Sequence, residues 1–400
     1  MDVSIIIPAY NAAQTISDTL ESVLAQTFAN WEAVVVDDGS GDRTADIVRG
    51  FIERDARIRM ISQPNGGESA ARNSGIAEAR YEWLLFLDAD DWISPLHLER
   101  MTGRLMSDPG LGAVHCGSVR VALDGTQVSD NYEPPEGDMF PTLARRAAFP
   151  VHACIVRRSL VEAVGKLDTS LKKSPDWDLW QRIARTGARF GAVREVLAYY
   201  RIQPNSSSLD AEQLFYDGLR VLRQGHAPDP RVPNPHPDYA GGWKQDKVES
   251  QQFYLLCWCA GLMLGYGKDA RSLFEAVKDD HYDGLYPNAI AQCIFEAATL
   301  PSGQPPRAWE RLWPKIEHLV KSFLAALEEQ SRTADLARRA LIELKKMILK
   351  HSPAWSTVIE DYERALAERQ ELIEQLKDRD EWKRLAEERV LLIRDLQEES

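Results

Sequence analysis

The stretch Tyr81-Glu-Trp-Leu-Leu-Phe-Leu-Asp-Ala-Asp-Asp91 decides the fold class of this 400-residue chain. Its continuous apolar run is typical of a strand covered on both faces, as in a parallel α/β sheet. The run ends in three carboxylates, and ligands of open α/β sheets bind beyond the carboxyl ends of strands. Crowded carboxylates repel one another, whereas Mg²⁺ or Mn²⁺ prefers carboxylate and phosphate oxygens. The alternative to a metal site is that the three carboxylates form a solvated acidic turn or cap a helix. Motifs elsewhere in the chain are needed to choose between these interpretations.

Length and composition exclude several classes of protein. A chain of this length is too long for one typical core, so we expect two or three domains. The net charge of −13 argues against a nucleic-acid-binding protein, which normally carries a basic face. Five cysteines without a C-x-x-C spacing favour a reducing compartment over a disulfide framework.

Two features bear on the location of the protein. Met1 leads directly into a predicted strand, Val3–Ile7, without the pattern of a signal peptide. The longest apolar stretch, Phe253–Gly265, is shorter than the roughly 20 residues that a membrane helix needs. We therefore expect a cytoplasmic protein without a transmembrane segment, at most peripheral at the inner face of a membrane.

Strand and helix patterns alternate along the first 120 or so residues, as expected of a parallel sheet. Besides the run that ends at Asp88, the predicted strands are Val3–Ile7, Trp31–Val36 and Ile58–Ser62, and the predicted helices are Ile16–Phe28, Thr44–Arg54 and Ser69–Ala79. Further strands are predicted over Val114–Val121 and Ala192–Arg201, and a short helix over Trp177–Arg185. Four successive strand ends carry polar, glycine-containing or acidic loops, and a nucleotide pocket is expected there.

The second half of the chain has a different composition. We predict a Pro-rich connecting segment over 211–243, a helical domain over 244–352 and a long charged helix over 353–400. The last segment has no Pro or Gly from Trp355 to Glu399, and its apolar residues keep an interrupted 3/4 spacing. Two interpretations stay open: an imperfect coiled coil that joins copies or a partner protein, and a solvated helix that docks on its own domain.

Four motifs follow the predicted strands in order: Val3-Ser-Ile-Ile-Ile-Pro-Ala-Tyr-Asn11, Val36-Asp-Asp-Gly-Ser40, Asn65-Gly-Gly-Glu-Ser-Ala-Ala-Arg-Asn-Ser-Gly75 and Leu87-Asp-Ala-Asp-Asp-Trp92. With these motifs the chain resembles the family 2 glycosyltransferases, inverting enzymes of the GT-A fold that use nucleotide sugars. The resemblance covers about residues 1–209, which defines a predicted catalytic domain over 1–210. It implies a mixed, mainly parallel sheet flanked by helices, followed here by an α-helical C-terminal region.

The resemblance also implies an activity. A sugar would pass, with inversion, from a nucleotide donor to a hydroxyl group of a glycan or lipid-linked glycan, in surface polysaccharide or glycoconjugate synthesis. UDP is the commonest donor nucleotide in the family, and the reaction would depend on Mn²⁺ or Mg²⁺.

The nucleotide-binding residues implied by the resemblance are Pro8, Tyr10, Asp38, Asn65, Gly66, Arg72, Asp88 and Ala89. Asp38 would accept a hydrogen bond from the base, with Tyr10 near the base plane. Gly66 lets the backbone approach a ligand closely, and Arg72 could pair with a phosphate. The alternatives are a turn cap for Asp38, since Asp-Gly favours turns, and a contact of Arg72 with the loop at Asp38.

The metal ligands implied by the resemblance are Asp88, which would also face the ribose, and Asp90, which would hold the cation on the diphosphate. A cation there acts as a Lewis acid for the departing nucleoside diphosphate. For Asp91 two interpretations remain, a supporting role behind the metal ligands and a cap of the helix that begins near Ser94-Pro95.

Inversion also requires a base that takes the proton of the acceptor hydroxyl. The stretch Lys173-Ser-Pro-Asp-Trp-Asp-Leu-Trp-Gln-Arg182 is similar to the family motif that carries it, and Asp176 matches the base position. Pro175 stands where the family usually has Glu, which puts support of the base in doubt. Asp178 is the second candidate, although we expect it to cap the helix. Trp177 and Trp180 are expected either to form an acceptor platform or to pack in the core.

A last motif, Tyr199-Tyr-Arg-Ile-Gln-Pro-Asn-Ser-Ser-Ser208, follows a predicted strand. Relatives commonly place His where Gln203 stands, and an amide is a poorer metal ligand than imidazole. Arg201 and Ser206–Ser208 are expected to close over the diphosphate.

Two other functions are alternatives to sugar transfer. A sugar-phosphate nucleotidyltransferase would carry a Gly-rich, Arg-containing loop after the first strand, where this chain has Pro8-Ala-Tyr-Asn-Ala12. A catalytically degenerate GT-A scaffold would act through its helical C-terminal region. The intact acidic residues argue against that hypothesis, whereas Pro175 and Gln203 leave it open.

Overall fold

The computed structural model describes residues 1–122, 124–131, 135–202 and 210–351. Residues 1–344 form one compact unit. The predicted long charged helix or coiled coil over 353–400 lies outside the described residues.

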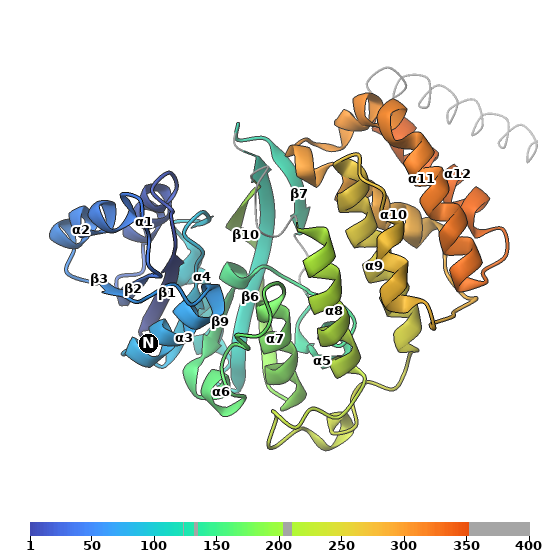
Figure 1. Ribbon diagram of the computed structural model, residues 1–400. Coiled ribbons are helices and arrows are strands. Elements are labelled where there is room, and N and C mark those ends of the chain that lie inside the picture. Colours follow the sequence, from blue (N-terminus) through green and yellow to red (C-terminus); the bar gives the residue numbers. More distant parts are fainter. Residues whose placement is uncertain (123, 132–134, 203–209, 352–400) are drawn as a thin grey trace, which may run out of the picture. The chain divides into compact units, whose positions relative to one another are not determined.

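Within the described residues, ten strands form one mixed sheet of the order β3-β2-β1-β4-β9-β6-β10-β5, with β7 on β6 and β8 on β10 (Figure 1). The strands are β1 Val3–Ala9, β2 Trp31–Asp37, β3 Ile58–Ser62, β4 Trp83–Phe86, β5 Trp92–Ile93, β6 Leu111–Ala122, β7 Gln127–Asn131, β8 Gly137–Asp138, β9 Cys154–Arg157 and β10 Arg189–Ile202. Pairs β1–β2, β2–β3, β1–β4 and β6–β10 are parallel, whereas β9 is antiparallel to β4 and β6. The predicted fold class is confirmed.

The helices of the sheet region are α1 Ile16–Leu24, α2 Thr44–Arg54, α3 Glu68–Glu78, α4 His97–Ser107, α5 Phe140–Leu143, α6 Arg158–Ala163 and α7 Pro175–Arg185. Strands β1, β2 and β4 are buried along their whole length, because α3 packs on one side of β1 and β2 and the neighbouring strands cover their edges. Gly75 permits this packing, since a Cβ atom there would lie 2.4 Å from Ile6 Cγ2.

The predicted connecting segment contains a helix, α8 Ala211–Gly225, which packs against α7 and α9 (Figure 1). Only its Pro-rich part, 226–243, lacks a long helix. Arg185 of α7 holds that part through hydrogen bonds to the carbonyl groups of Ala227 and Tyr239, at 2.8 and 3.1 Å. The domain boundaries themselves stay predictions.

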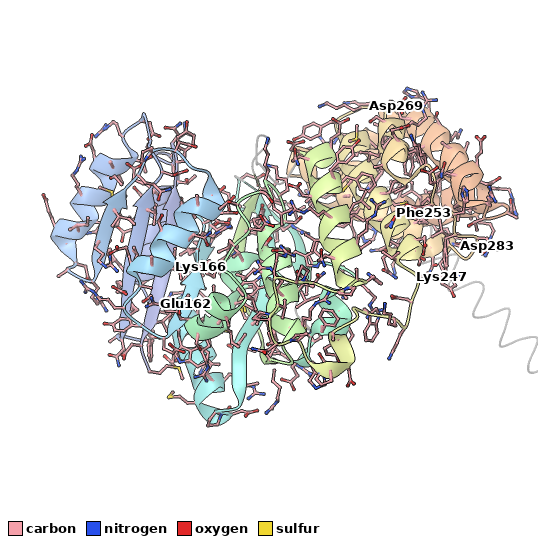
Figure 2. All side chains as sticks on the ribbon, turned by 60° about the horizontal axis from the view of Figure 1, so that its bottom comes forward. Glu162, Lys166, Lys247, Phe253, Asp269 and Asp283 are labelled. Atoms are coloured by element: carbon pink, nitrogen blue, oxygen red, sulfur yellow. The ribbon has the colours of Figure 1, made fainter. Side chains whose placement is uncertain are left out.

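The helical region continues with α9 Val248–Gly265, α10 Pro287–Ala298, α11 Trp309–Ser331 and α12 Leu336–Lys350. Phe253 of α9 is fully buried, whereas Lys247, Asp269 and Asp283 lie at the surface (Figure 2). Among the described helices, none combines the length and the apolar character that crossing a membrane requires.

Candidate active site

A cavity of about 300 Å³ lies at the carboxyl ends of β1 and β4. It is lined by Pro8, Tyr10, Asn11, Ala12, Gln14, Thr15, Glu68, Asp88, Ala89, Asp90 and Tyr200. Five of the predicted site residues are thus among its lining, and the ring of Tyr10 is 54% exposed. An exposed aromatic ring beside a polar cavity suits the stacking of a planar base.

The loop after β1 lines this cavity and is hydrogen-bonded to the loop after β2. The Asp38 amide donates to the carbonyl of Ala9 at 2.8 Å, and the Gly41 amide donates to Asn11 Oδ1 at 2.8 Å. The Ala12 amide donates to the Thr44 hydroxyl at 2.8 Å. These bonds hold the loop that carries Tyr10 against the next strand end.

Asp38 is buried and holds the glycine loop in front of α3. Its carboxylate accepts hydrogen bonds from the amides of Gly66 and Gly67, at 2.9 and 2.8 Å, and from Gln63 Nε2 at 2.7 Å. The cap of its own turn is supplied by Asp37, whose Oδ1 accepts from the Ser40 amide at 3.1 Å. The turn-cap interpretation of Asp38 is therefore wrong, while its contact with a base stays a prediction.

Arg72 is the positive centre of an acidic cluster. Its side chain is only 2% exposed, and Nη2 pairs with Glu68 and donates to Asp88 Oδ1 at 2.5 Å. The alternative contact with the loop at Asp38 is thus wrong. Sequence analysis missed Glu68, although its place four residues before Arg72 on a helix was a signal for the pair. Arg72 thus holds Asp88, which lines the cavity.

Asp90 lies in surroundings that disfavour its charge. Burial, together with the neighbouring carboxylates of Asp91 and Asp88, raises the pKa of Asp90 to about 8. A divalent cation would reverse this repulsion, so the chemistry of Asp88 and Asp90 fits a cation. In the described part of the chain, no three His, Cys, Asp or Glu side chains come together as a metal site. Further ligands would have to come from phosphate oxygens or water, as is usual for Mg²⁺.

Asp91 supports the acidic turn from behind and does not cap a helix. It is buried, its Oδ2 lies 3.0 Å from His152 Nδ1, and its Oδ1 accepts from the Arg201 amide at 2.7 Å. Helix α4 instead has Leu96 at its N-cap, so the helix-cap interpretation is wrong. Burial lowers the pKa of His152, but the charge of Asp91 raises it, and the resulting pKa lies above the usual value of a histidine. No sequence signal pointed to His152, because 61 residues separate it from Asp91.

Arg201 is anchored rather than free to swing over a ligand. Its Nε donates to the Asp90 carbonyl at 2.7 Å, and its Nη2 donates to Asp18 Oδ2 at 2.9 Å. The guanidinium also lies 4.7 Å from the centre of the Trp92 ring. Arg201 therefore ties β10 to the acidic turn and to α1. Gln203 and Ser206–Ser208 lie outside the described residues.

Asp176 stands in the first turn of α7 and belongs to the same acidic cluster. Burial raises the pKa of Asp176 and the charge of Asp88 adds to the effect, whereas Arg72 opposes it. The charges of Arg72 and Asp88 thus act on Asp176, although Asp176 is not among the residues that line the cavity. Pro175 occupies the first position of the helix, where its missing N–H costs nothing.

The side chains that follow Asp176 in α7 stabilise the fold. Asp178 is buried inside α7 and pairs with Arg182 at 2.7 Å and with Arg231 at 2.8 Å, while Ser174 is the N-cap. Asp178 is therefore neither a cap nor free to accept a proton. Trp177 and Trp180 are buried in the core, and Trp177 Nε1 donates to the Leu143 carbonyl at 2.6 Å. Their burial leaves no ring face for an acceptor, so the platform interpretation is wrong.

The loop in front of α7 is held by α8. Asp217 Oδ2 accepts from the amides of Lys172 and Lys173, at 2.9 and 2.8 Å. Arg220 donates to Ser170 Oγ at 2.8 Å and to Asp168 Oδ2 at 3.1 Å. Sequence analysis missed this contribution because it treated 211–243 as a connecting segment.

The D-x-D turn thus follows the parallel strand β4, and its two carboxylates line the cavity. The family described as Glycosyl transferase family 2 matches residues 4–165. The chain is 33% identical over 218 residues to the uncharacterized glycosyltransferase EpsJ of Bacillus subtilis, a match that spans 51% of this chain and 62% of EpsJ. It is 30% identical over 208 residues to the putative teichuronic acid biosynthesis glycosyltransferase TuaG of the same organism, across 52% of this chain and 81% of TuaG.

Among solved structures, S. aureus TarS 1–349 in complex with UDP is similar to the chain. The TM-score is 0.49 at 15% identity, and the match covers 88% of this chain and 91% of that one. From the sequence matches, the chain belongs to glycosyl transferase family 2.

Proposed function

We propose that the protein transfers a sugar from a UDP-linked donor to a hydroxyl group of a glycan or lipid-linked glycan, with inversion and with a divalent cation. The observation that carries this proposal is the cavity beyond β1 and β4, which Asp88 and Asp90 line, together with the contact of Arg72 with Asp88 and the action of both charges on Asp176. The names of similar proteins, which include a chondroitin synthase and a putative teichuronic acid biosynthesis glycosyltransferase, support polysaccharide synthesis as the setting. The cytoplasmic location and an association through the C-terminal helix stay predictions.

Asp176 is assigned the role of base. It would take the proton of the acceptor hydroxyl while the bond between the sugar and the diphosphate breaks on the opposite face. Burial raises the pKa of Asp176, which makes the carboxylate a stronger proton acceptor once it is ionised, whereas the charge of Arg72 favours the ionised form.

The donor would be held by the strand-end loops. Tyr10 would stack on the base, which Asp38 would recognise beside the glycine loop. Asp88 and Asp90 would hold the cation, and Arg72 would compensate phosphate charge from the far side of Asp88. The cation, when bound, supplies Lewis-acid stabilisation of the departing diphosphate.

Two variants test these roles. The stabilisation of the protein by nucleotide sugars with Mn²⁺ is measured by thermal shift over a panel of donors, and turnover is measured as release of nucleoside diphosphate. Asp90→Ala should lose the Mn²⁺-dependent stabilisation. Asp176→Asn should keep it and lose about 10²–10⁴-fold in turnover, the usual contribution of a general base. Asp46→Ala, at an exposed position of α2, serves as the control.

Two results would contradict the proposal. If Mn²⁺ strengthens UDP binding by Asp90→Ala as much as it does for the wild type, the cation assignment fails. If Asp176→Asn turns over at the wild-type rate, the base lies elsewhere.

A further inference from the structure

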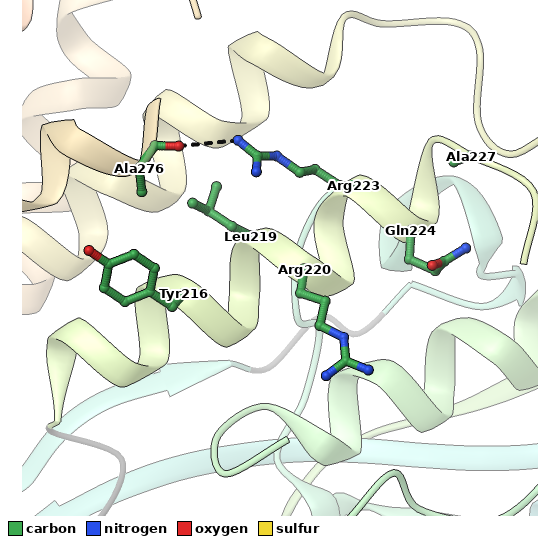
Figure 3. A pocket seen from close by; sticks show the side chains of 7 residues that line it. All are labelled: Tyr216, Leu219, Arg220, Arg223, Gln224, Ala227 and Ala276. Atoms are coloured by element: carbon green, nitrogen blue, oxygen red, sulfur yellow. Dashed lines mark hydrogen bonds between the residues drawn. The ribbon is translucent and has the colours of Figure 1, made fainter. Parts of the chain in front are cut away.

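A second cavity, of about 570 Å³, lies along α8 and shares no lining residue with the cavity at the acidic turn. It is lined mainly by one face of α8, with Tyr216, Leu219, Arg220 and Arg223 at helical spacing (Figure 3). Ala276 of the 3₁₀ helix Arg271–Val277 contributes to the lining from the helical region. Its volume lies within the range of about 300–1,000 Å³ that is common for small-ligand sites.

The two guanidinium groups of this cavity keep hydrogen-bonding capacity. Arg223 is 50% exposed, and its Nη2 has three long contacts: 3.3 Å to the Ala276 carbonyl (Figure 3), 3.3 Å to Asp280 Oδ2 and 3.4 Å to Gln252 Oε1. These distances are beyond the usual 2.7–3.2 Å of an N–H···O bond, so they hold the group weakly. Among the described residues, Nε and Nη1 of Arg223 make no further contact.

Arg220 is 54% exposed and uses Nη1 and Nη2 for its contacts with Ser170 and Asp168. A guanidinium has five N–H donors, so both groups can still bind an anion. Planar forks of this kind bind carboxylate and phosphate oxygens in a bidentate manner.

An aromatic ring lines the same cavity as these cations. Tyr216 is 49% exposed, and Leu219 adds an apolar surface to the same face. A pyranose ring has an apolar C–H face, which an exposed aromatic ring can cover, and hydroxyl groups at its edge, which Arg and Gln side chains can bind. The lining thus combines an apolar face for a sugar ring with two cations for an acidic substituent.

We propose that the α8 cavity binds an acidic saccharide unit of the glycan acceptor, away from the unit that receives the new sugar. The identification of the glycan as acceptor rests on the proposed function, whereas the binding of an acidic saccharide does not. The contacts of α8 connect this cavity to the base. Arg220 lines the cavity and also holds Ser170 and Asp168, while Asp217 of the same helix holds the amides of Lys172 and Lys173, three residues before Asp176.

The test measures binding of trigalacturonate to the full chain by isothermal titration calorimetry, without a nucleotide and at low ionic strength. The wild type should bind trigalacturonate at least ten-fold more tightly than maltotriose, its neutral counterpart. Arg223→Gln should weaken trigalacturonate binding at least ten-fold, because it removes the cation that the base loop does not use. Tyr216→Ala should weaken the binding of both probes. Arg271→Gln, an exposed arginine outside the cavity lining, is the matched control and should change nothing.

Further binding measurements distinguish this site from the donor site and identify the anion that it binds. Asp90→Ala should leave trigalacturonate binding unchanged, so a failure of the donor assignment does not affect this result. Tighter binding of glucose 6-phosphate than of galacturonate, with the same dependence on Arg223, would also support the site and would identify phosphate as the anion. Equal binding of trigalacturonate by Arg223→Gln and wild type would overturn the proposal. So would equal binding of trigalacturonate and maltotriose by the wild type, or displacement of trigalacturonate by UDP with Mn²⁺.

Discussion

Replacing Asp217 tests whether α8 positions the base loop. Asp217 accepts two backbone hydrogen bonds, at 2.9 and 2.8 Å, from the amides of Lys172 and Lys173. Hydrogen bonds to a charged group contribute about 1.5–3 kcal/mol each, so Asp217→Ala removes about 3–6 kcal/mol of interactions, part of which water replaces. Asp217→Asn keeps an acceptor oxygen but loses the charge, and we expect it to cost about half as much.

The functional consequence should fall on turnover rather than on donor binding. A displacement of about 1 Å at a reacting group can cost about 100-fold in rate. We therefore expect Asp217→Asn to lower kcat by about 10–100-fold, while the Kd for UDP with Mn²⁺ stays within about two-fold of wild type. Steady-state release of UDP gives kcat, and calorimetry gives Kd. Glu212→Gln, on an exposed part of the same helix, is the control.

Two results would refute this reasoning. An unchanged kcat in Asp217→Ala would show that the loop keeps its position without the two hydrogen bonds to Asp217. A loss of UDP affinity as large as the loss of kcat would show that the substitution disturbs the whole sheet region rather than the loop.

Three further predictions concern stability. Asp178→Ala should destabilise the protein by about 3–5 kcal/mol in urea unfolding, because it leaves the buried guanidinium of Arg182 without its carboxylate. Gly75→Ala should cost about 1–3 kcal/mol in the same assay, since its Cβ would lie 2.4 Å from Ile6 Cγ2. Burial lowers the pKa of His115 from its usual value of 6.5 to about 4. Between these two pH values the unfolded chain binds more protons than the folded protein, so the stability of the folded protein decreases as the pH is lowered. Between pH 7 and 5.5 the wild type should therefore lose about 1.3 kcal/mol more than His115→Phe.

Each of these predictions has an outcome that contradicts it. A cost below about 1 kcal/mol for Asp178→Ala would mean that water reaches Arg182. A neutral Gly75→Ala would mean that α3 can shift away from β1 without loss. Parallel pH profiles for wild type and His115→Phe would mean that His115 is protonated in the folded protein, despite its place against Phe149 at 4.4 Å between ring centres.

Much of the sheet was predictable because its signals are local. The strand Ile58–Ser62 and the helix Thr44–Arg54 have the predicted bounds, since continuous apolar runs and helical spacing are properties of short segments. Other bounds shifted where a helix ended early, as for α1, which ends at Leu24 instead of Phe28. The antiparallel strand β9 was not predicted, because three buried residues followed by one half-buried residue give too short a pattern.

The sequence by itself determined the order of the strand-end loops and the residues that they present: Tyr10, Asp38, Asp88 and Asp90 follow strands whose apolar runs can be read directly. It also assigned the family, because the motifs occur in one order. Only the tertiary structure decided which carboxylates are engaged elsewhere. Asp178 lies two residues from Asp176, yet it forms an ion pair with Arg231, a residue 53 positions away. Asp91 is likewise paired with His152. The physical reason is that charge pairing in a buried site depends on distance in space, whereas the pattern of a strand or helix depends on neighbours along the chain.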